Sequence, residues 1–323
     1  MSDFFNGRTV AVTGATGFVG SHFLEQLLSM GAKIKGIRHL REPVVDDPSI
    51  EWLTADLSIQ EECDKALEGS SCVIHAAGAV SAAGVTSSSN PMSPITENLV
   101  LTTRVLQGAW TAGAERFLVF SSSTGYPPAE HAVKEDEFWS ADTYPGYFGY
   151  GWMRRYLERI SEFAHQRSEM KLAIIRPTAV YGPRDDFDPV TSHVIPALIR
   201  RAVEKEDPYV VWGSPDVVRD FLHISDLVRG CLLALEKYST ADPINIGYGD
   251  SITIGEIVTT ILDATDHNAS PKYDTSKPTT IPFRMADISK AKEKLGFSPT
   301  ISFVDGLTDT VNWYISKSNI PAS

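Results

Sequence analysis

The sequence predicts an α/β protein with a Rossmann-type, doubly wound parallel sheet and a smaller C-terminal α/β substrate lobe. Strand-like apolar runs alternate with helical stretches through the first half of the chain, which is typical of βαβ units. A glycine-rich turn also joins the first strand-like run to the first helical one. A chain of 323 residues with 42% hydrophobic content can bury the core of one large domain, or of two domains that share a cleft.

Short apolar runs locate the strands of the first half. We expect strands at Thr9–Thr13, Lys33–Arg38, Cys72–His75, Arg116–Phe120 and Lys171–Arg176, with one more directly before Asp56. Apolar residues at helical spacing predict helices over Phe18–Met30, Pro94–Ala112 and Tyr147–Arg167. The last two helices are candidates for pairing between subunits, so we expect a homodimer.

The pattern loosens after Pro177, where prolines from Pro183 to Pro299 separate short elements. We therefore expect residues 1–178 to form the dinucleotide-binding domain, rejoined by parts of 220–245. Residues 179–323 would then form most of a loop-rich, substrate-binding lobe.

Composition excludes several classes of function. A net charge of −12 disfavours nucleic acid as a partner, and no apolar run reaches the length of a membrane span. Cys63, Cys72 and Cys231 are too scattered for a disulfide framework or a zinc knuckle, and the histidines show no metal-binding spacing. The N-terminal residues lack the features of a signal peptide. We expect a cytoplasmic protein with no metal ion, no nucleic-acid partner and no membrane partner.

The glycine-rich turn predicts a dinucleotide site. Glycines permit a tight turn and close approach of the backbone to a pyrophosphate, and the N-terminus of the next helix attracts the anion. The expected cofactor-binding residues here are Gly14, Thr16, Gly17, Phe18, Val19 and Gly20. The alternative is a glycine-rich turn that binds nothing.

The end of the second strand indicates which dinucleotide binds. An acidic residue there accepts the ribose 2′-hydroxyl of NAD, whereas cations suit the 2′-phosphate of NADP. The segment Gly36–Arg41 carries Arg38 and Arg41 and no carboxylate. NADP(H) is therefore favoured, and NAD(H) remains possible.

Two further segments are expected beside the dinucleotide. Asp56 and Leu57 follow the third strand, where they could contact the adenine. Ala76, Ala77 and Gly78 end the fourth strand with small residues where the dinucleotide must pass.

Tyr150 and Arg154 lie four residues apart in the expected helix and so share one helical face. A fixed positive charge at this distance favours the ionised phenol, which could then exchange a proton near neutral pH. The spacing is common by chance, so its meaning depends on the motifs around it.

Taken together, these motifs resemble the extended short-chain dehydrogenases/reductases, the NAD(P)-dependent nucleotide-sugar epimerase/dehydratase family. The segments that carry the resemblance run in the family's order: the glycine turn, Asp56–Leu57, His75–Gly78, Ser121–Ser123, Tyr150-x-x-x-Arg154 and Arg176–Arg184. The family normally has Lys at the position of Arg154. Tyr147 is the competing tyrosine, but it would place Gly151 at the cation position. Tyr150 is preferred because Glu158 follows Arg154 as in the family's Lys-x-x-x-Glu.

The resemblance implies catalytic roles. Ser122, four residues before Tyr126, would hold the substrate oxygen while Tyr150 passes a proton and the nicotinamide passes a hydride. Tyr150, Arg154 and Pro177 would also contact the cofactor. The alternative is that the serine run is only a polar segment that ends its strand and has no catalytic role.

Within the family, the second half resembles GDP-L-fucose synthases, which act on GDP-4-keto-6-deoxymannose. Residues 192–201 and 211–226 carry that likeness. It implies that Arg201 and Arg219 grip a nucleotide diphosphate, that Trp212 lines the substrate site and that Arg284 adds a third cation. Arginine suits this role because its planar fork matches phosphate oxygens.

Two positions depart from the synthase pattern. Those enzymes move protons with a Cys and a His, and His193 matches the His. Thr124 stands in place of the Cys, and a threonine hydroxyl is a far weaker acid than a thiol. Ala179 replaces an Asn found in many relatives. Ser123 and Thr124 remain expected substrate contacts. No acidic pair follows Ser122, so 4,6-dehydration is disfavoured.

The preferred hypothesis is an NAD(P)-dependent reductase or epimerase that works at C4 of a nucleotide-diphosphate sugar. A UDP-sugar 4-epimerase is the nearest alternative. A reductase for another carbonyl, such as a steroid or flavonoid, would share the same first half. A non-catalytic dinucleotide-binding sensor or scaffold is the alternative of another class, and the missing Lys motivates it.

Overall fold

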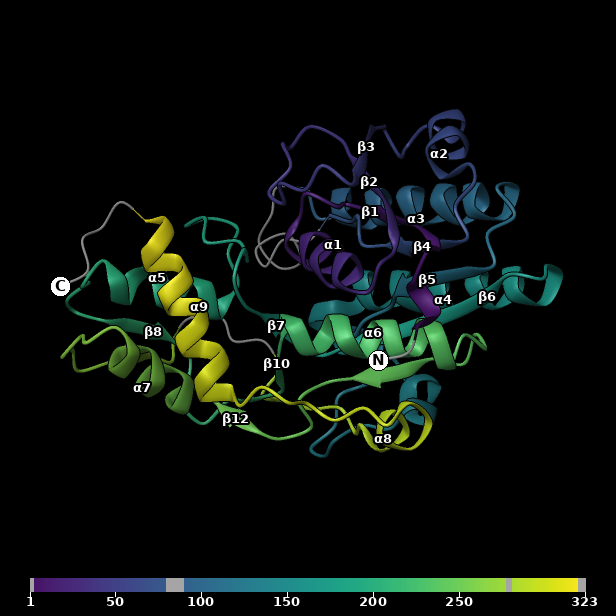
Figure 1. Cartoon of the computed structure of the whole chain (residues 1–323). Coiled ribbons are helices and arrows are strands. Elements are labelled where there is room, and N and C mark those ends of the chain that lie inside the picture. Colours follow the sequence, from purple (N-terminus) through teal and green to yellow (C-terminus); the bar gives the residue numbers. More distant parts are fainter. Residues whose placement is uncertain (1–2, 80–89, 277–280, 319–323) are drawn as a thin grey trace.

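The computed structural model describes residues 3–79, 90–276 and 281–318. Its centre is a seven-stranded parallel sheet with the strand order β11-β6-β5-β4-β1-β2-β3 (Figure 1). The strands are β1 (Thr9–Thr13), β2 (Lys33–Arg38), β3 (Ile50–Thr54), β4 (Cys72–His75), β5 (Arg116–Phe120), β6 (Lys171–Pro177) and β11 (Ile244–Ile246). The predicted fold class is confirmed, and the expected strands of the first half agree with those observed.

Helices cover both faces of the sheet. One face packs against α1 (Phe18–Ser29), α6 (Ile224–Lys237) and α8 (Ser289–Leu295), and the other against α2 (Gln60–Leu67), α3 (Ser93–Thr111) and α4 (Phe148–Arg167). Phe23 and Cys231 are fully buried on the first face, and Cys63 and Val105 on the second. Parallel strands buried on both faces read as continuous apolar runs, which is why they were visible in the sequence.

The chain reverses its winding between β1 and β4, which are neighbours in the sheet. In open α/β sheets, ligands bind at the carboxyl ends of the strands beside such a switch point. Thr13 and His75 end these two strands, and Thr13 Oγ1 lies 2.9 Å from His75 Nδ1. Burial lowers the pKa of His75 to about 3, so its ring is neutral near physiological pH.

The C-terminal elements gather at one end of the molecule (Figure 1). They comprise α5 (Val194–Val203), α7 (Ile254–Ala264), α9 (Phe303–Lys317) and the short strands β7 (Ala179–Tyr181), β8 (Val210–Trp212), β9 (Val218–Arg219), β10 (Phe221–His223), β12 (Ile252–Thr253), β13 (Lys272–Asp274) and β14 (Phe283–Arg284). Ile199, Ile257 and Leu307 are fully buried in their shared core.

The expectation of a loop-rich second half was therefore wrong in part. Pro196 lies in the first turn of α5, where backbone N–H groups have no partner within the helix, so proline does not break it. The region 220–245, parts of which we expected to rejoin the first domain, contributes to the main sheet and its cover: β11 pairs in parallel with β6, and α6 packs on the same face as α1. Within the described residues, no helix combines the length and apolar character needed to span a membrane.

Candidate active site

The glycine turn has the backbone expected of an anion cradle. Gly14 has a φ of 64°, and a Cβ added there would lie 2.7 Å from the Cα of Ala77, so only glycine fits. Gly17 caps α1 without a side-chain hydrogen bond, and the first turn of α1 carries no acidic side chain. The N-terminus of α1 is thus open to an anion such as a pyrophosphate.

Two orphaned polar atoms mark the same edge of the sheet. Ser121 and Arg154 are 4% and 8% exposed, and Ser121 Oγ and Arg154 Nε are buried without a hydrogen-bond partner among the residues that the structure describes. A buried unpaired donor typically costs about 1–3 kcal/mol. The polar groups of a dinucleotide would supply partners, so the residues at this edge fit such a cofactor.

Arg38, at the end of β2, is already engaged. Its Nη1 donates to Glu42 at 2.5 Å, and its Nε donates to Thr54 Oγ1 at 3.3 Å. Of the two expected adenine contacts, Leu57 is buried in the core. The Asp56 carboxylate accepts hydrogen bonds from the hydroxyl and amide of Ser58, which lower the pKa of Asp56.

Tyr150 and Arg154 are in direct contact. Arg154 Nη2 donates to the Tyr150 hydroxyl at 2.5 Å, while Nη1 donates to the carbonyl of Phe120 at 2.9 Å. The guanidinium carbon lies 4.9 Å from the centre of the tyrosine ring. Arg154 therefore ties the phenol to the carboxyl end of β5.

The serine turn lies against the start of α4. Ser122 caps the 3-10 helix η2 (Ser123–Gly125), and its Oγ accepts hydrogen bonds from Thr124 N at 3.2 Å and Thr124 Oγ1 at 2.9 Å. A Cβ added to Gly151 would lie 2.7 Å from the Thr124 carbonyl oxygen. The absence of a side chain at Gly151 allows α4 to approach the turn this closely.

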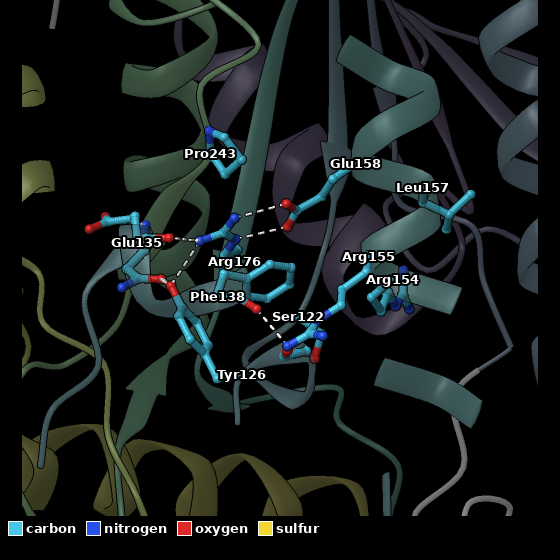
Figure 2. A network of polar contacts seen from close by, with 12 residues as sticks. Ser122, Tyr126, Glu135, Phe138, Arg154, Arg155, Leu157, Glu158, Arg176 and Pro243 are labelled. Carbon is cyan, nitrogen blue, oxygen red and sulfur yellow. Dashed lines mark hydrogen bonds and ion pairs between the residues drawn. The ribbon is translucent and has the colours of Figure 1, made fainter. Parts of the chain in front are cut away.

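A buried polar network lies beside the turn (Figure 2). Arg176 on β6 donates from Nε and Nη2 to the two carboxylate oxygens of Glu158 on α4, both at 2.8 Å. Arg176 Nη1 donates to the hydroxyl of Tyr126 at 3.0 Å, and that hydroxyl donates to Asn245 at 2.6 Å. Arg176 and Glu158 are 2% and 1% exposed, so the pair is fully desolvated and both charges are matched.

Arg155 makes a second buried connection. Its guanidinium donates to the carbonyls of Gly125, Phe138 and Ala141 at 2.9, 2.6 and 2.7 Å, and the residue is 2% exposed. Figure 2 shows it between α4 and the segment that includes Phe138. Arg155 was not predicted as part of the site. Its guanidinium lies over the rings of Phe138 and Trp139, and this adjacent aromatic pair is the sequence feature that could have indicated a buried cation.

Two arginines meet on the substrate side. Arg219 and Arg284 are partners in the parallel pairing of β9 with β14. Burial, and then the charge of Arg284, lower the pKa of Arg219 to about 10. Arg284 lies over the Tyr147 ring, and within the described part of the chain its Nη1 is buried without a hydrogen-bond partner. Positive charge is concentrated here, as an anionic group requires.

His193 caps the N-terminus of α5. Part of its ring is open to solvent, but the surrounding protein removes enough water to lower its pKa. Asp186 raises this pKa and Arg284 lowers it, so His193 and Arg284 are close enough to influence one another. The ring is neutral near pH 7 and can accept a proton.

A narrow pocket joins several of these groups. Its wall includes the predicted contacts Ser123, Thr124 and Arg284, together with residues that the sequence analysis did not select: Tyr126, Pro127, Ala129, His131, Val133, Tyr144, Tyr147, Ile281, Phe283 and Met285. Tyr147 was rejected as the proton donor in favour of Tyr150, but it lies beside the predicted substrate contacts in this pocket.

Arg201 and Trp212, two further predicted substrate contacts, are not among the residues that line this pocket. Arg201 donates from Nε and Nη2 to Glu206 at 2.5 and 2.7 Å, so its guanidinium is already paired. Trp212 ends β8 with 66% of its surface exposed. A diphosphate role for Arg201 would require the pair with Glu206 to break, and that role remains a prediction.

The fold and this arrangement of side chains define a dinucleotide-dependent enzyme of the extended short-chain dehydrogenase/reductase class. A family model described as the NAD dependent epimerase/dehydratase family matches residues 10–247. The chain belongs to this family.

Named relatives agree with the class. The chain is 30% identical over 320 residues to a probable GDP-L-fucose synthase 1 of Oryza sativa subsp. japonica, covering 96% of this chain and 93% of that protein. It is 26% identical to a dTDP-4-dehydro-6-deoxy-D-allose reductase of Streptomyces bikiniensis, covering 97% and 98%. A UDP-glucose 4-epimerase from Thermotoga maritima, solved with UDP-glucose, superposes with a TM-score of 0.85 at 25% identity, covering 95% and 98%.

Proposed function

We propose that the protein is an NAD(P)-dependent reductase or epimerase that acts at C4 of a nucleotide-diphosphate sugar. The contact of Arg154 with the Tyr150 hydroxyl, beside the Ser122 turn, is the observation that carries this proposal. A phenol that is held by a cation and lies near the Ser122 hydroxyl is suited to proton exchange with a sugar oxygen.

The hydrogen bonds of Ser122 support its role. Its oxygen accepts two hydrogen bonds from Thr124, so its own O–H proton is left to donate to a ligand. In our proposal Ser122 holds the C4 oxygen, and Tyr150 gives a proton to that oxygen or takes one from it. A nicotinamide ring, when bound, supplies or removes the hydride at C4. Gly14, Gly17, Ser121 and Arg154 would hold that cofactor.

The anionic part of the substrate is assigned to Arg219 and Arg284. These cations lie side by side across β9 and β14, and no described residue pairs with the Nη1 of Arg284. A diphosphate carries several acceptor oxygens that match guanidinium donors. His193, near Arg284, would face the sugar end as a proton acceptor.

Two reactions remain candidates. The similarity to a probable GDP-L-fucose synthase and to a dTDP-4-dehydro-6-deoxy-D-allose reductase favours reduction. The likeness to a UDP-glucose 4-epimerase favours epimerisation. Thr124 at the Cys position argues against the complete fucose-synthase reaction, because a threonine hydroxyl does not release its proton near neutral pH.

We also propose a homodimer through α3 and α4. Large apolar side chains lie exposed on these helices: Trp110 on α3, and Phe148, Trp152, Tyr156 and Phe163 on α4. The α4 residues are four, four and seven residues apart, which is one or two helical turns each time, so they form one stripe along the helix. A stripe of this size exposed to water is typical of an interface.

A substrate panel tests the proposed reaction. Purified protein is supplied with NADPH or NADH and with UDP-, GDP- and dTDP-linked 4-keto sugars, and oxidation of the dinucleotide is followed by absorbance. Epimerisation of ordinary UDP- and GDP-hexoses is followed by chromatography. We expect one nucleotide sugar to turn over, and Arg219→Ala to raise its KM more than it lowers kcat. No turnover with any of them, while a Lys-containing relative is active, would overturn the proposal.

A further inference from the structure

We propose that Glu42 sets the choice between NAD and NADP by occupying the guanidinium of Arg38. The inference rests on dinucleotide binding and needs no assumption about the sugar substrate. The segment Gly36–Arg41, from which we predicted the cofactor preference, contains no carboxylate. Glu42 is the next residue in the chain and lies four residues after Arg38. The structure brings the carboxylate of Glu42 back onto Arg38 at 2.5 Å.

The position of Arg38 makes this pairing relevant to cofactor choice. Arg38 is the last residue of β2, where this fold distinguishes a ribose 2′-hydroxyl from a 2′-phosphate. Thr54 on the neighbouring strand β3 accepts a hydrogen bond from Nε, which holds the side chain along the carboxyl edge of the sheet. The remaining donors of the guanidinium are the ones that a phosphate would use, and Glu42 takes one of them.

The other nearby carboxylates are committed to the backbone. Asp56 accepts the amide and hydroxyl of Ser58, and Glu62 accepts the amide of Asp56 at 2.6 Å. The side chain of Glu42 is 83% exposed and forms an ion pair with Arg38. Glu42 can therefore be changed with little effect on the fold.

The charges predict the direction of the effect. A 2′-phosphate brings negative charge and at least two acceptor oxygens, so it competes with Glu42 for Arg38 and is repelled by the carboxylate. The 2′-hydroxyl of NAD is neutral, and a carboxylate can accept its proton in a hydrogen bond. Glu42 therefore weakens the binding of NADP and has little effect on NAD, or favours it slightly.

The test measures binding of NADP⁺ and NAD⁺ by isothermal titration calorimetry, without a sugar present. We expect Glu42→Gln to tighten NADP⁺ binding about two- to fivefold, within the range of exposed charge pairs, and to change NAD⁺ binding by less than about 1.5-fold. Glu169→Gln is the matched control, because it removes one exposed carboxylate that lies two residues before β6, four strands away from β2 in the sheet. Because the pair is exposed, the gain should shrink in high salt.

A second variant separates competition for Arg38 from simple repulsion. In an Arg38→Gln background, the change Glu42→Gln should improve NADP⁺ binding far less than it does with Arg38 present. The proposal is overturned if Glu42→Gln acts no more strongly than Glu169→Gln, or if it changes both dinucleotides alike. Inactivity on every sugar would leave this result unaffected, so failure of the proposed reaction is distinguishable.

Discussion

At the scale of single residues, Arg154 replaces the ammonium group of the family's Lys with a planar guanidinium. Two of its nitrogens are used at once, on the Tyr150 hydroxyl and on the Phe120 carbonyl. A lysine at this position could supply the charge, but it has one nitrogen in place of a fork. The structure therefore explains how an arginine can hold the tyrosine here.

The substitution Arg154→Lys tests whether the positive charge or the fork matters. We expect kcat to stay within about tenfold of wild type, because the charge beside the phenol is kept, and Arg154→Met to lose about 100-fold or more. Initial rates at saturating dinucleotide give the comparison. If Arg154→Met were as active as wild type, the cation would have no part in the reaction.

His22, on the buried side of α1, predicts how stability depends on pH. Burial, and to a smaller extent Arg184, lower the pKa of His22 from 6.5 to about 4, although a hydrogen bond to the Phe18 carbonyl raises it. The unfolded chain therefore takes up the proton first. The stabilisation is complete above pH 6.5 and is lost as the pH falls toward 4.

The variant His22→Asn should reduce this pH dependence. Between pH 7.5 and 4.5, wild type should lose about 2 kcal/mol more unfolding free energy than the variant does. Urea denaturation at both pH values measures the difference. Equal losses in the two proteins would show that His22 is not buried in its neutral form.

At the scale of elements, the site depends on how α4 is held against the segment that follows β5. Arg155 ties α4 to three carbonyls of that segment, and the Arg176–Glu158 pair ties α4 to β6. These contacts fix the distance between the serine turn and the tyrosine. Neither contact touches the predicted substrate, so their role is to position other residues.

Truncation of Arg155 should loosen this arrangement. Arg155→Ala leaves three buried carbonyls unpaired and is expected to lower the unfolding free energy by about 3 kcal/mol or more. Arg159→Ala, one turn later, is the control, because Arg159 is 55% exposed and pairs with Glu162 at the surface; we expect a loss below about 1 kcal/mol. Equal losses in the two variants would contradict the assignment.

The elements differ in how far the sequence could predict them. The strands of the first half were predictable because most of them are buried apolar runs between helices, whereas β11, at the edge of the same sheet, was not predicted. The strands β9, β12 and β14 have only two residues each, so they carry no periodicity, and their partners lie far apart in the sequence. Their pairing, which brings Arg219 beside Arg284, follows from the fold and not from a local pattern.

Side-chain pairing was also beyond the sequence. Arg201 and Arg219 looked equivalent as candidate phosphate ligands, yet the structure gives them different partners. Arg201 pairs with the carboxylate of Glu206, whereas Nη1 of Arg219 donates to the backbone carbonyls of Val218 and Pro282. Glu158 was recognised as part of a motif, but its partner Arg176 lies 18 residues away on β6. The glycine turn and the tyrosine were predictable because their chemistry depends on local spacing.

At the scale of the whole molecule, the apolar stripe on α4 predicts the assembly. Tyr156 and Phe163 are each 54% exposed in this stripe. The double variant Tyr156→Glu and Phe163→Glu would place two charges in the proposed interface, so we expect the dimer to dissociate into monomers. Val190→Glu is the control, since Val190 is 76% exposed but lies between β7 and α5. Sedimentation velocity distinguishes the two states. A wild-type monomer at micromolar concentration would contradict the proposal.

The central claim is that the Tyr150 hydroxyl passes the proton in a dinucleotide-dependent reaction. The most direct measurement compares Tyr150→Phe with wild type on the nucleotide sugar that the substrate panel identifies, with dinucleotide affinity measured in parallel. We predict a fall in kcat of about 10²- to 10⁴-fold, with dinucleotide affinity within about twofold because Arg154 remains in place. Turnover by Tyr150→Phe at the wild-type rate would contradict the account.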